Sequence, residues 1–244
     1  MSSREPSPFD QSYFSSGTYE KVSFRKGSQY WWSNRFYARL VRRYGPPAGR
    51  LLEVGCGLGH LLARLTPVYE TYGVDVNSWA LEQAGANAPA AHLQSGSAED
   101  LSDFADGFFQ VLMAKHVVEH LPQPEAAVAE FARVLAPGGL AVVSTPNLDS
   151  PMRQRKGRQW IGYRDRTHIS LRNPAEWSAM AASAGLMVRR AFSDGFWDPP
   201  YVSGLPVRLQ RLLFGAPGGA QAILGIPFLP IAWGESIILI LDKA

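Results

Sequence analysis

The 244-residue chain has little of several features that would assign its class directly. Cys56 is its single cysteine, which excludes an intrachain disulfide and gives no sign of an oxidising compartment. No apolar run reaches the roughly 20 residues that a membrane-spanning helix needs. The segment 1–10 has no positive stretch leading into an apolar one, so we expect a loose tail rather than a cleaved signal. These absences predict a cytoplasmic protein.

Charge is also balanced, with 24 Lys and Arg against 21 Asp and Glu and a net charge of +3. That excess is too small to indicate nucleic-acid binding, and we expect no nucleic-acid partner. What the chain does have is a hydrophobic fraction of 46% with 18% charged residues, the composition of a folded protein. Its length suits one α/β domain.

Apolar segments alternate between strand-like runs and helical spacing along most of the chain. The pattern predicts strands over 50–54, 71–75, 91–94, 110–114, 140–144, 186–192 and 235–242. It predicts helices over 28–44, 59–65, 78–86, 124–135 and 174–184. Regular alternation of this kind indicates a parallel sheet with helices on both faces.

Three segments stand apart from the alternating pattern. We expect 1–44 to form a tail and an aromatic lid helix, and 45–244 to form the α/β domain. Within that domain, 193–234 is rich in Gly, Pro, Phe and Trp and is too long for a simple turn. We therefore predict that it forms a cap inserted before the last strand.

A turn of glycines follows the first predicted strand, at Gly55, Gly57 and Gly59. Glycines between a buried strand and a helix let the backbone approach a ligand closely and direct unpaired N–H groups toward it. Asp75 closes the second strand 20 residues after Gly55, where a carboxylate can accept bonds from both hydroxyls of a ribose. Glu53 precedes the glycines and would repel a pyrophosphate, so the ligand is expected to carry an ammonium rather than phosphates.

Five motifs in order make the chain resemble the class I S-adenosylmethionine-dependent methyltransferases over roughly residues 50–190. They are Leu52–Gly59, Val74–Asp75, Ser97–Asp100, Val118–Leu121 and Leu135–Leu140. The resemblance implies a Rossmann-like, mostly parallel seven-stranded sheet whose last strand is antiparallel, with S-adenosylmethionine as the cofactor. It implies cofactor contacts from Glu53, Gly55, Cys56, Gly57, Gly59, Asp75, Val76, Ala98, Glu99 and Lys115.

The segment from His116 to His120 also spells the HxxEH pattern of one class of zinc peptidases. Pro122 and Pro124 leave little room for the long helix that such a peptidase needs. The same segment resembles that of quinone-biosynthesis O-methyltransferases, some of which bind a divalent cation there. His116 replaces their usual acidic residue, so we expect no metal; the ligands of one would be His116, Glu119 and His120.

Three histidines are candidates for the general base that an O-methyl transfer uses. His116 and His120 lie in the motif just described, and His168 belongs to an Asp-x-x-His pattern that related methyltransferases carry beside the acceptor. His120 is equally well explained as a hydrogen-bonded residue of a turn. The sequence leaves the choice open.

Two further segments bear on the acceptor. The segment 151–172 contains seven basic residues and one acidic residue. It forms either a solvated loop or a cradle for an anionic group, and Trp160 and Tyr163 are available for stacking. The stretch 205–233 is basic and amphipathic and then apolar. It suits a lipid-linked acceptor met at the inner face of a membrane, and the alternatives are a packed cap or a homodimer interface.

These patterns predict a methyltransferase that acts on an oxygen of a small or lipid-linked acceptor bearing an anionic group. A protein that binds the cofactor without catalysis is one alternative, against which the intact Glu53, Asp75 and glycines count. A nucleic-acid methyltransferase is another. The chain lacks an Asn-Pro-Pro-Tyr motif of the kind that contacts a flipped base, and Ser144 to Asn147 does not replace one.

Overall fold

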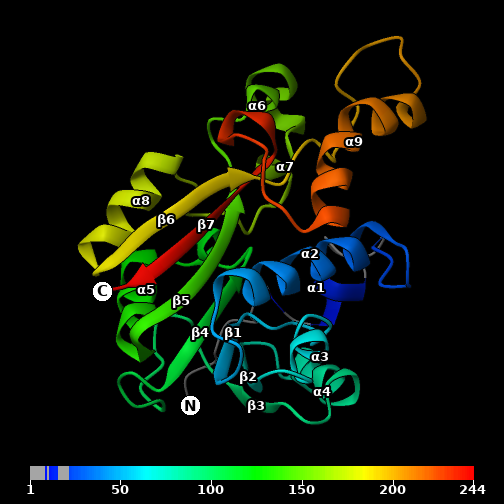
Figure 1. Cartoon of the computed structure of the whole chain (residues 1–244). Helices are drawn as coiled ribbons and strands as arrows, with labels where there is room; N and C mark the ends of the chain where they lie inside the picture. The colour runs from blue at the N-terminus through cyan, green and yellow to red at the C-terminus, as the bar shows by residue number, and fades with distance from the viewer. Residues whose placement is uncertain (1–8, 10, 16–21) are drawn as a thin grey trace, which may run out of the picture.

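The computed structural model describes residue 9, residues 11–15 and residues 22–244 of the chain. Seven strands form one sheet in the order β3-β2-β1-β4-β5-β7-β6 (Figure 1). Their bounds are β1 Arg50–Val54, β2 Glu70–Asp75, β3 His92–Ser95, β4 Phe109–Lys115, β5 Leu135–Pro146, β6 Leu186–Ser193 and β7 Ser236–Lys243. Strands β1 to β5 pair in parallel, and β7 runs antiparallel to both β5 and β6. The predicted mostly parallel sheet with an antiparallel last strand is confirmed.

Helices cover both faces of the sheet because successive side chains of the central strands point to opposite sides. On β1, Leu51 belongs to one apolar core and Leu52 to the other. The helices α5 (Pro124–Val134) and α8 (Pro174–Ser183) pack in the core that contains Leu52. On the other face, α2 (Gln29–Tyr44) and α3 (Leu62–Leu65) pack in the core that contains Leu51, and α4 (Ser78–Asn87) lies beside it. This arrangement is that of a doubly wound α/β fold.

The sheet reverses its direction of winding between β1 and β4. From β1 the chain proceeds outward through β2 to β3, and it then returns to place β4 on the other side of β1. Connections leaving two neighbouring strands in opposite directions open a crevice at their carboxyl ends, where α/β folds bind ligands. The glycine turn after β1 and the Lys115–His120 segment after β4 both lie at that crevice.

Two predicted elements differ in length from those observed. The helix expected from residue 59 is a single turn, α3, because residues 55–61 form the turn that faces the crevice. The fifth strand starts at Leu135 rather than at 140, and an irregularity in its pairing with β4 absorbs the extra residues. Gly138 adopts a φ of +72° there, and the glycines belong to this bulged part of the strand.

Helices also form in several segments for which the sequence predicted none. The basic stretch forms α6 (Pro151–Lys156), η2 (Gly157–Gln159) and α7 (Ile161–Arg164), and α1 covers Gln11–Ser15. The predicted cap carries α9 (Val207–Leu224) and η3 (Ile231–Trp233), and η1 spans Val118–His120 in the sheet crevice. Within the described residues no helix is both long and apolar enough to cross a membrane.

Candidate cofactor and acceptor site

A cavity of about 520 Å³ lies at the carboxyl ends of β1, β2 and β4, within the usual size range of small-molecule sites. All but one of the residues predicted to contact the cofactor line it: Glu53, Gly55, Cys56, Gly57, Asp75, Val76, Ala98, Glu99 and Lys115. Gly59 is the exception. A Cβ there would stand 2.9 Å from the Cα of Ala84, so Gly59 allows close packing of the turn against α4 rather than lining the cavity.

The glycine turn is held against the end of β2 by backbone hydrogen bonds. The amides of Gly55 and Cys56 donate to the carbonyl of Val74, at 2.7 and 3.1 Å. Gly55 has a φ of +65°, and a Cβ at this position would lie 2.4 Å from a methyl group of Val117. A side chain is therefore excluded twice, by the backbone conformation and by the neighbouring side chain.

Both carboxylate oxygens of Asp75 accept backbone hydrogen bonds. Oδ2 accepts from the amide of Gly57 at 2.8 Å, and Oδ1 accepts from the amide of Asn77 at 2.9 Å. Each oxygen keeps a second lone pair for a ligand. Burial raises the pKa of Asp75, and these two amide donors oppose the rise. The carboxylate is thus fixed in orientation at the edge of the cavity.

Two ionisable side chains, the buried Glu53 and the half-buried Lys115, line the cavity near each other. Burial raises the pKa of Glu53 to about 8, and the nearby Lys115 ammonium opposes this rise. Burial likewise lowers the pKa of Lys115 to about 8. Oε2 of Glu53 has no hydrogen-bond partner among the described residues. A buried carboxylate oxygen without a donor suits a cationic ligand group, since a cation would satisfy it.

Lys115 is positioned by α2, which the sequence did not connect with the site. Its Nζ donates to Oδ1 of Asn34 at 2.7 Å and lies 4.3 Å from the ring centroid of Tyr30 and 4.9 Å from that of Tyr37. Asn34 and Tyr30 both line the cavity. They were missed because helical spacing alone does not say which end of a helix reaches a crevice.

Aromatic residues near the start of the described chain cover the cavity. Phe9, Tyr13 and Phe14 are among the lining residues, and the ring of Phe9 meets that of His120 edge-on at 5.3 Å. The helix predicted as a lid, α2, packs on the core through buried residues such as Phe36 and Leu40, and its role as a lid stays a prediction. The short α1 therefore lies over the site, and α2 forms part of its wall.

His116 and Glu119 form a pair at the end of β4. Nδ1 of His116 lies 3.0 Å from Oε1 of Glu119, whose side chain is fully buried. His116 has a φ of +54°, a strained conformation for a residue with a side chain, of the kind found at functional sites. Burial alone would raise the pKa of Glu119, but its hydrogen bond with His116, together with smaller contributions from the other nearby histidines, holds the pKa below its usual value.

His120 lies between the cavity and a chain of hydrogen bonds. Its Nδ1 is 2.9 Å from Oγ1 of Thr167, and that hydroxyl is 2.5 Å from Oδ1 of Asp165. The hydroxyl has one hydrogen, which it donates to the carboxylate, so it must accept the hydrogen of Nδ1. This arrangement leaves Nε2 of His120 as the unprotonated nitrogen. Burial lowers the pKa of His120, which favours the neutral ring.

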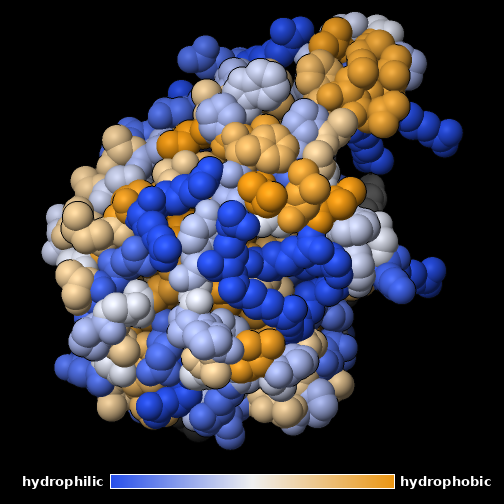
Figure 2. Space-filling model, in the orientation of Figure 1, coloured by the Kyte–Doolittle hydropathy of each residue, from blue (hydrophilic) through white to orange (hydrophobic). Residues whose placement is uncertain are grey.

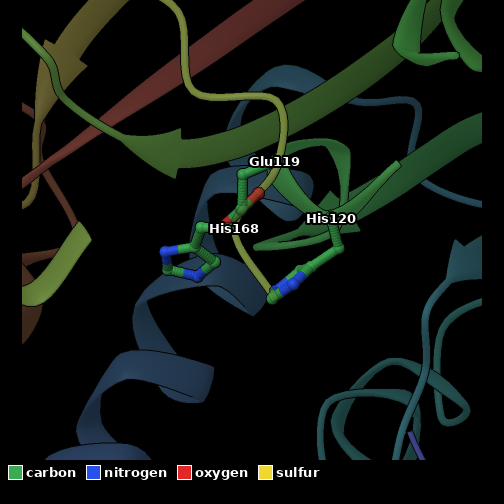
Figure 3. A group of neighbouring side chains, drawn as sticks. All are labelled: Glu119, His120 and His168. Atoms are coloured by element: carbon green, nitrogen blue, oxygen red, sulfur yellow. The ribbon is translucent and has the colours of Figure 1, made fainter. Parts of the chain in front are cut away.

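Figure 3 shows Glu119, His120 and His168 converging from η1 and from the segment before α8. Each offers one ligand atom within 4.8 Å of the others, a set that differs from the predicted His116, Glu119 and His120. His168 does not line the cavity, because it lies behind His120 with ring centroids 4.7 Å apart and its Nδ1 2.8 Å from the carbonyl of Gly162. It is therefore placed to support His120.

The fold rules out the zinc-peptidase alternative. His116 lies outside any helix, and His120 ends the three-residue η1. Histidines four residues apart reach one metal from a shared helical face, and here there is no such face.

Most of the basic segment is engaged away from the cavity. Arg172 pairs with Glu125, and both Lys156 and Arg164 pair with Asp198. Arg166 is the one basic residue of the segment that lines the cavity. Trp160, expected to be available for stacking, is fully buried with its Nε1 donating to Glu235 at 2.7 Å. An extended anion cradle is therefore not formed.

The sheet order, the glycine turn and a carboxylate at the end of β2 together define a Rossmann-like nucleoside-binding enzyme fold. Residues 30–191, more than half of the chain, match the methyltransferase domain family. The chain belongs to this family and is an S-adenosylmethionine-dependent methyltransferase.

Known relatives differ in what they methylate. A ubiquinone biosynthesis O-methyltransferase from Thiobacillus denitrificans is 30% identical over 192 residues, 68% of this chain and 82% of that protein. A dTDP-3-amino-3,4,6-trideoxy-alpha-D-glucopyranose N,N-dimethyltransferase from Streptomyces venezuelae is 35% identical over 131 residues, 51% of this chain and 54% of that protein. The crystal structure of the YcgJ protein from Bacillus subtilis shares the fold, with a TM-score of 0.61 at 21% identity over 85% of this chain and 98% of that one.

Proposed function

We propose that the enzyme methylates an oxygen of a small or lipid-linked acceptor that carries an anionic group. The observation that carries this proposal is the His120–Thr167–Asp165 chain beside the cofactor cavity. An oxygen nucleophile must lose a proton during methyl transfer, and a neutral histidine can remove it. The name of the relative from Thiobacillus denitrificans supports an oxygen acceptor.

Three groups of the cavity would hold the cofactor, which supplies an electrophilic methyl group on a sulfonium. Asp75 would accept hydrogen bonds from the ribose hydroxyls with the lone pairs that its amide donors leave. Glu53 would receive the ammonium of the methionine end, and Lys115 lies near enough to bind its carboxylate. Ala98 and Glu99 would contact the adenine from the end of β3.

His120 would act as the general base. Thr167 and Asp165 fix the tautomer with the Nδ1 hydrogen, so Nε2 is free to accept the proton of the acceptor. Asp165 also stabilises the imidazolium that forms, as the carboxylate does in a serine protease triad. His116 would position the loop that carries this base through its contact with Glu119. His168 would support the base itself, held in place by its contact with the carbonyl of Gly162.

Arg166 is the residue proposed to select an anionic acceptor. It lines the cavity beside Thr167, and a guanidinium can bind a carboxylate or phosphate with two hydrogen bonds. The aromatic cover of Phe9, Tyr13 and Phe14 would shield the reacting atoms from water and offer apolar contacts to the rest of the acceptor.

The proposal is tested with His120→Gln against wild-type enzyme, using phenolic and lipid-linked acceptors that carry a carboxylate or phosphate. We expect kcat to fall on the order of a hundredfold or more, because a general base contributes about that much. The affinity for S-adenosylhomocysteine, measured by calorimetry, should stay within a factor of about two, since His120 does not hold the cofactor.

His92→Gln serves as the control, because His92 lies on the exposed edge strand β3. Undiminished turnover of His120→Gln with an oxygen acceptor would remove His120 from the mechanism. Turnover with amine acceptors alone would instead favour nitrogen methylation, the activity named for the Streptomyces venezuelae relative.

A further inference from the structure

The α9 helix projects from the body of the enzyme with an uncovered apolar face. Figure 1 shows α9 as a bent helix whose first part extends away from the sheet, and the helix contains Pro217, a residue type that kinks helices. The second half lies against α2, where Nη1 of Arg39 donates to the carbonyls of Ala222 and Ile223. The projecting half therefore has its outer side turned to solvent.

Apolar side chains are gathered on one face of this helix. The exposed positions repeat at spacings of three and four residues, which places them in a single stripe: Leu209, Leu212, Leu213, Ala216, Ala220, Ile223 and Leu224. Leu212 is 66% exposed and Leu224 is 60% exposed. Figure 2 shows the corresponding apolar surface over α9 at the upper right of the molecule. Apolar patches of this kind mark interaction sites.

The helix is held rigidly enough to present that stripe. Gln210, buried on the opposite side, accepts from the amide of Val202 at 3.0 Å and donates to the carbonyl of Leu205 at 2.6 Å. Gln221, also buried, donates to the carbonyl of Ser193 and accepts from the amide of Leu229. The two glutamines of the helix thus face inward, and the apolar stripe faces outward.

The charge around α9 indicates what kind of partner the apolar stripe contacts. Residues 199–234 contain two arginines and no acidic residue, and both arginines, Arg208 and Arg211, are exposed beside the stripe. The exposed Arg155, which donates to the carbonyl of Tyr201, adds a third cation at the base of the projection. A second copy of this surface would meet the same positive charge, whereas an anionic lipid headgroup layer complements it.

We propose that α9 is a membrane-docking helix, which lies in the interface of an anionic lipid bilayer with the Leu209–Leu224 stripe in the acyl region. Interfacial helices combine an apolar face with Arg or Lys at the headgroup level. The site is linked to this surface through α2, which packs on α9 and carries Asn34 and Tyr30 of the cavity. The docking surface goes beyond the proposed function, and vesicle binding can be measured without the acceptor.

The test is flotation of the full chain with vesicles of phosphatidylcholine alone or of phosphatidylcholine mixed with phosphatidylglycerol. Wild-type protein should float with the mixed vesicles, less with the neutral ones and less again at high salt. The double variant Leu212→Gln/Leu213→Gln should bind the mixed vesicles at least about tenfold more weakly, because two exposed leucines lose their burial in lipid. Arg208→Gln/Arg211→Gln should lose roughly fivefold per arginine.

Met187→Gln is the matched control, since Met187 is 61% exposed but lies on β6. It should bind vesicles like the wild type, and both variants should keep wild-type affinity for S-adenosylhomocysteine. Equal binding by the leucine variant and the wild type would overturn the proposal. So would a wild-type dimer that does not float and that the leucine variant converts to a monomer, because the stripe would then be an interface between two copies.

Discussion

The two carboxylates beside the glycine turn are prepared for different partners. Asp75 is oriented by amide donors on both of its oxygens and keeps lone pairs for neutral hydroxyl groups. Glu53 is more deeply buried, and one of its oxygens has no donor within the described residues. The first therefore suits a ribose and the second suits an ammonium, which are the two polar ends of one cofactor.

Removal of the Asp75 carboxylate should weaken cofactor binding. We expect Asp75→Ala to lose about 1.5 to 3 kcal/mol of binding free energy for S-adenosylhomocysteine, because hydrogen bonds to a charged group are lost. Calorimetric titration measures this loss directly. Glu82→Ala, which removes an exposed carboxylate from α4, should bind like the wild type. Equal affinity of Asp75→Ala and Glu82→Ala would contradict the placement of the ribose.

The contribution of the Thr167 hydroxyl to catalysis can be tested separately from that of His120, the base that it positions. Thr167→Val should lower kcat roughly tenfold, since one hydrogen bond that selects the His120 tautomer is lost. The acid limb of the kcat–pH profile should move to lower pH, because the imidazolium loses an acceptor and its pKa falls further. Thr167→Ser should restore both values. An unchanged pH profile in Thr167→Val would reduce Thr167 to a structural residue.

At the scale of elements, the inserted segment is joined to the sheet by buried amide side chains. Gln221 donates to the carbonyl of Ser193 at 2.8 Å and accepts from the amides of Phe228 and Leu229 at 2.8 and 2.9 Å. One side chain of α9 thus satisfies backbone groups at the end of β6 and in the strand-like stretch before β7. Such connections let a long insertion adopt one position.

Gln221→Leu should therefore destabilise the fold. The substitution roughly keeps the side-chain size but removes the hydrogen-bond partner of the Ser193 carbonyl and of the Phe228 and Leu229 amides, which we expect to lower the free energy of unfolding by about 2 to 5 kcal/mol. Urea denaturation followed by circular dichroism measures the change. Gln159→Leu, at an exposed position in η2, provides the control and should change stability little. A matching midpoint for the two variants would show that the anchoring bonds contribute nothing.

At the scale of the whole molecule, three buried carboxyls keep protons that the unfolded chain would lose. Burial raises the pKa of Glu53 to about 8, of Glu235 to about 7 and of Asp194 to about 6. A carboxyl whose pKa is raised by folding binds more protons in the folded state, so its contribution to stability falls as pH rises toward the folded pKa. Burial of His120 has the opposite effect, but only below its ordinary pKa.

The cofactor-free enzyme should therefore lose stability as pH rises from about 4.5, the ordinary pKa of a glutamate, to about 8, the raised pKa of Glu53, with Glu235 contributing up to about pH 7. Glu53→Gln cannot ionise, so its melting temperature should fall less steeply over this range. Differential scanning fluorimetry of both proteins across the range gives the comparison. Parallel melting curves at every pH would mean that Glu53 is already ionised in the folded protein.

The sequence by itself determined the fold class and predicted where the cofactor site lies. The alternation of apolar runs requires a parallel sheet, and the glycine turn and Asp75 are close in sequence to the strands that carry them, so local spacing predicts their meeting at the cavity. The family match confirmed the methyltransferase prediction. The roles of the single residues at the site remain predictions.

Only the tertiary structure decided which side chains meet from distant segments. His120 meets Thr167 across 47 positions of the chain, and Lys115 meets Asn34 across 81, so no local pattern could pair them. The fold also places Arg166, but not the other basic residues of its segment, at the cavity. It buries Trp160, whose Nε1 donates to Glu235. Helical spacing identifies an apolar stripe on α9, but only the folded chain shows that no neighbouring element among the described residues covers it.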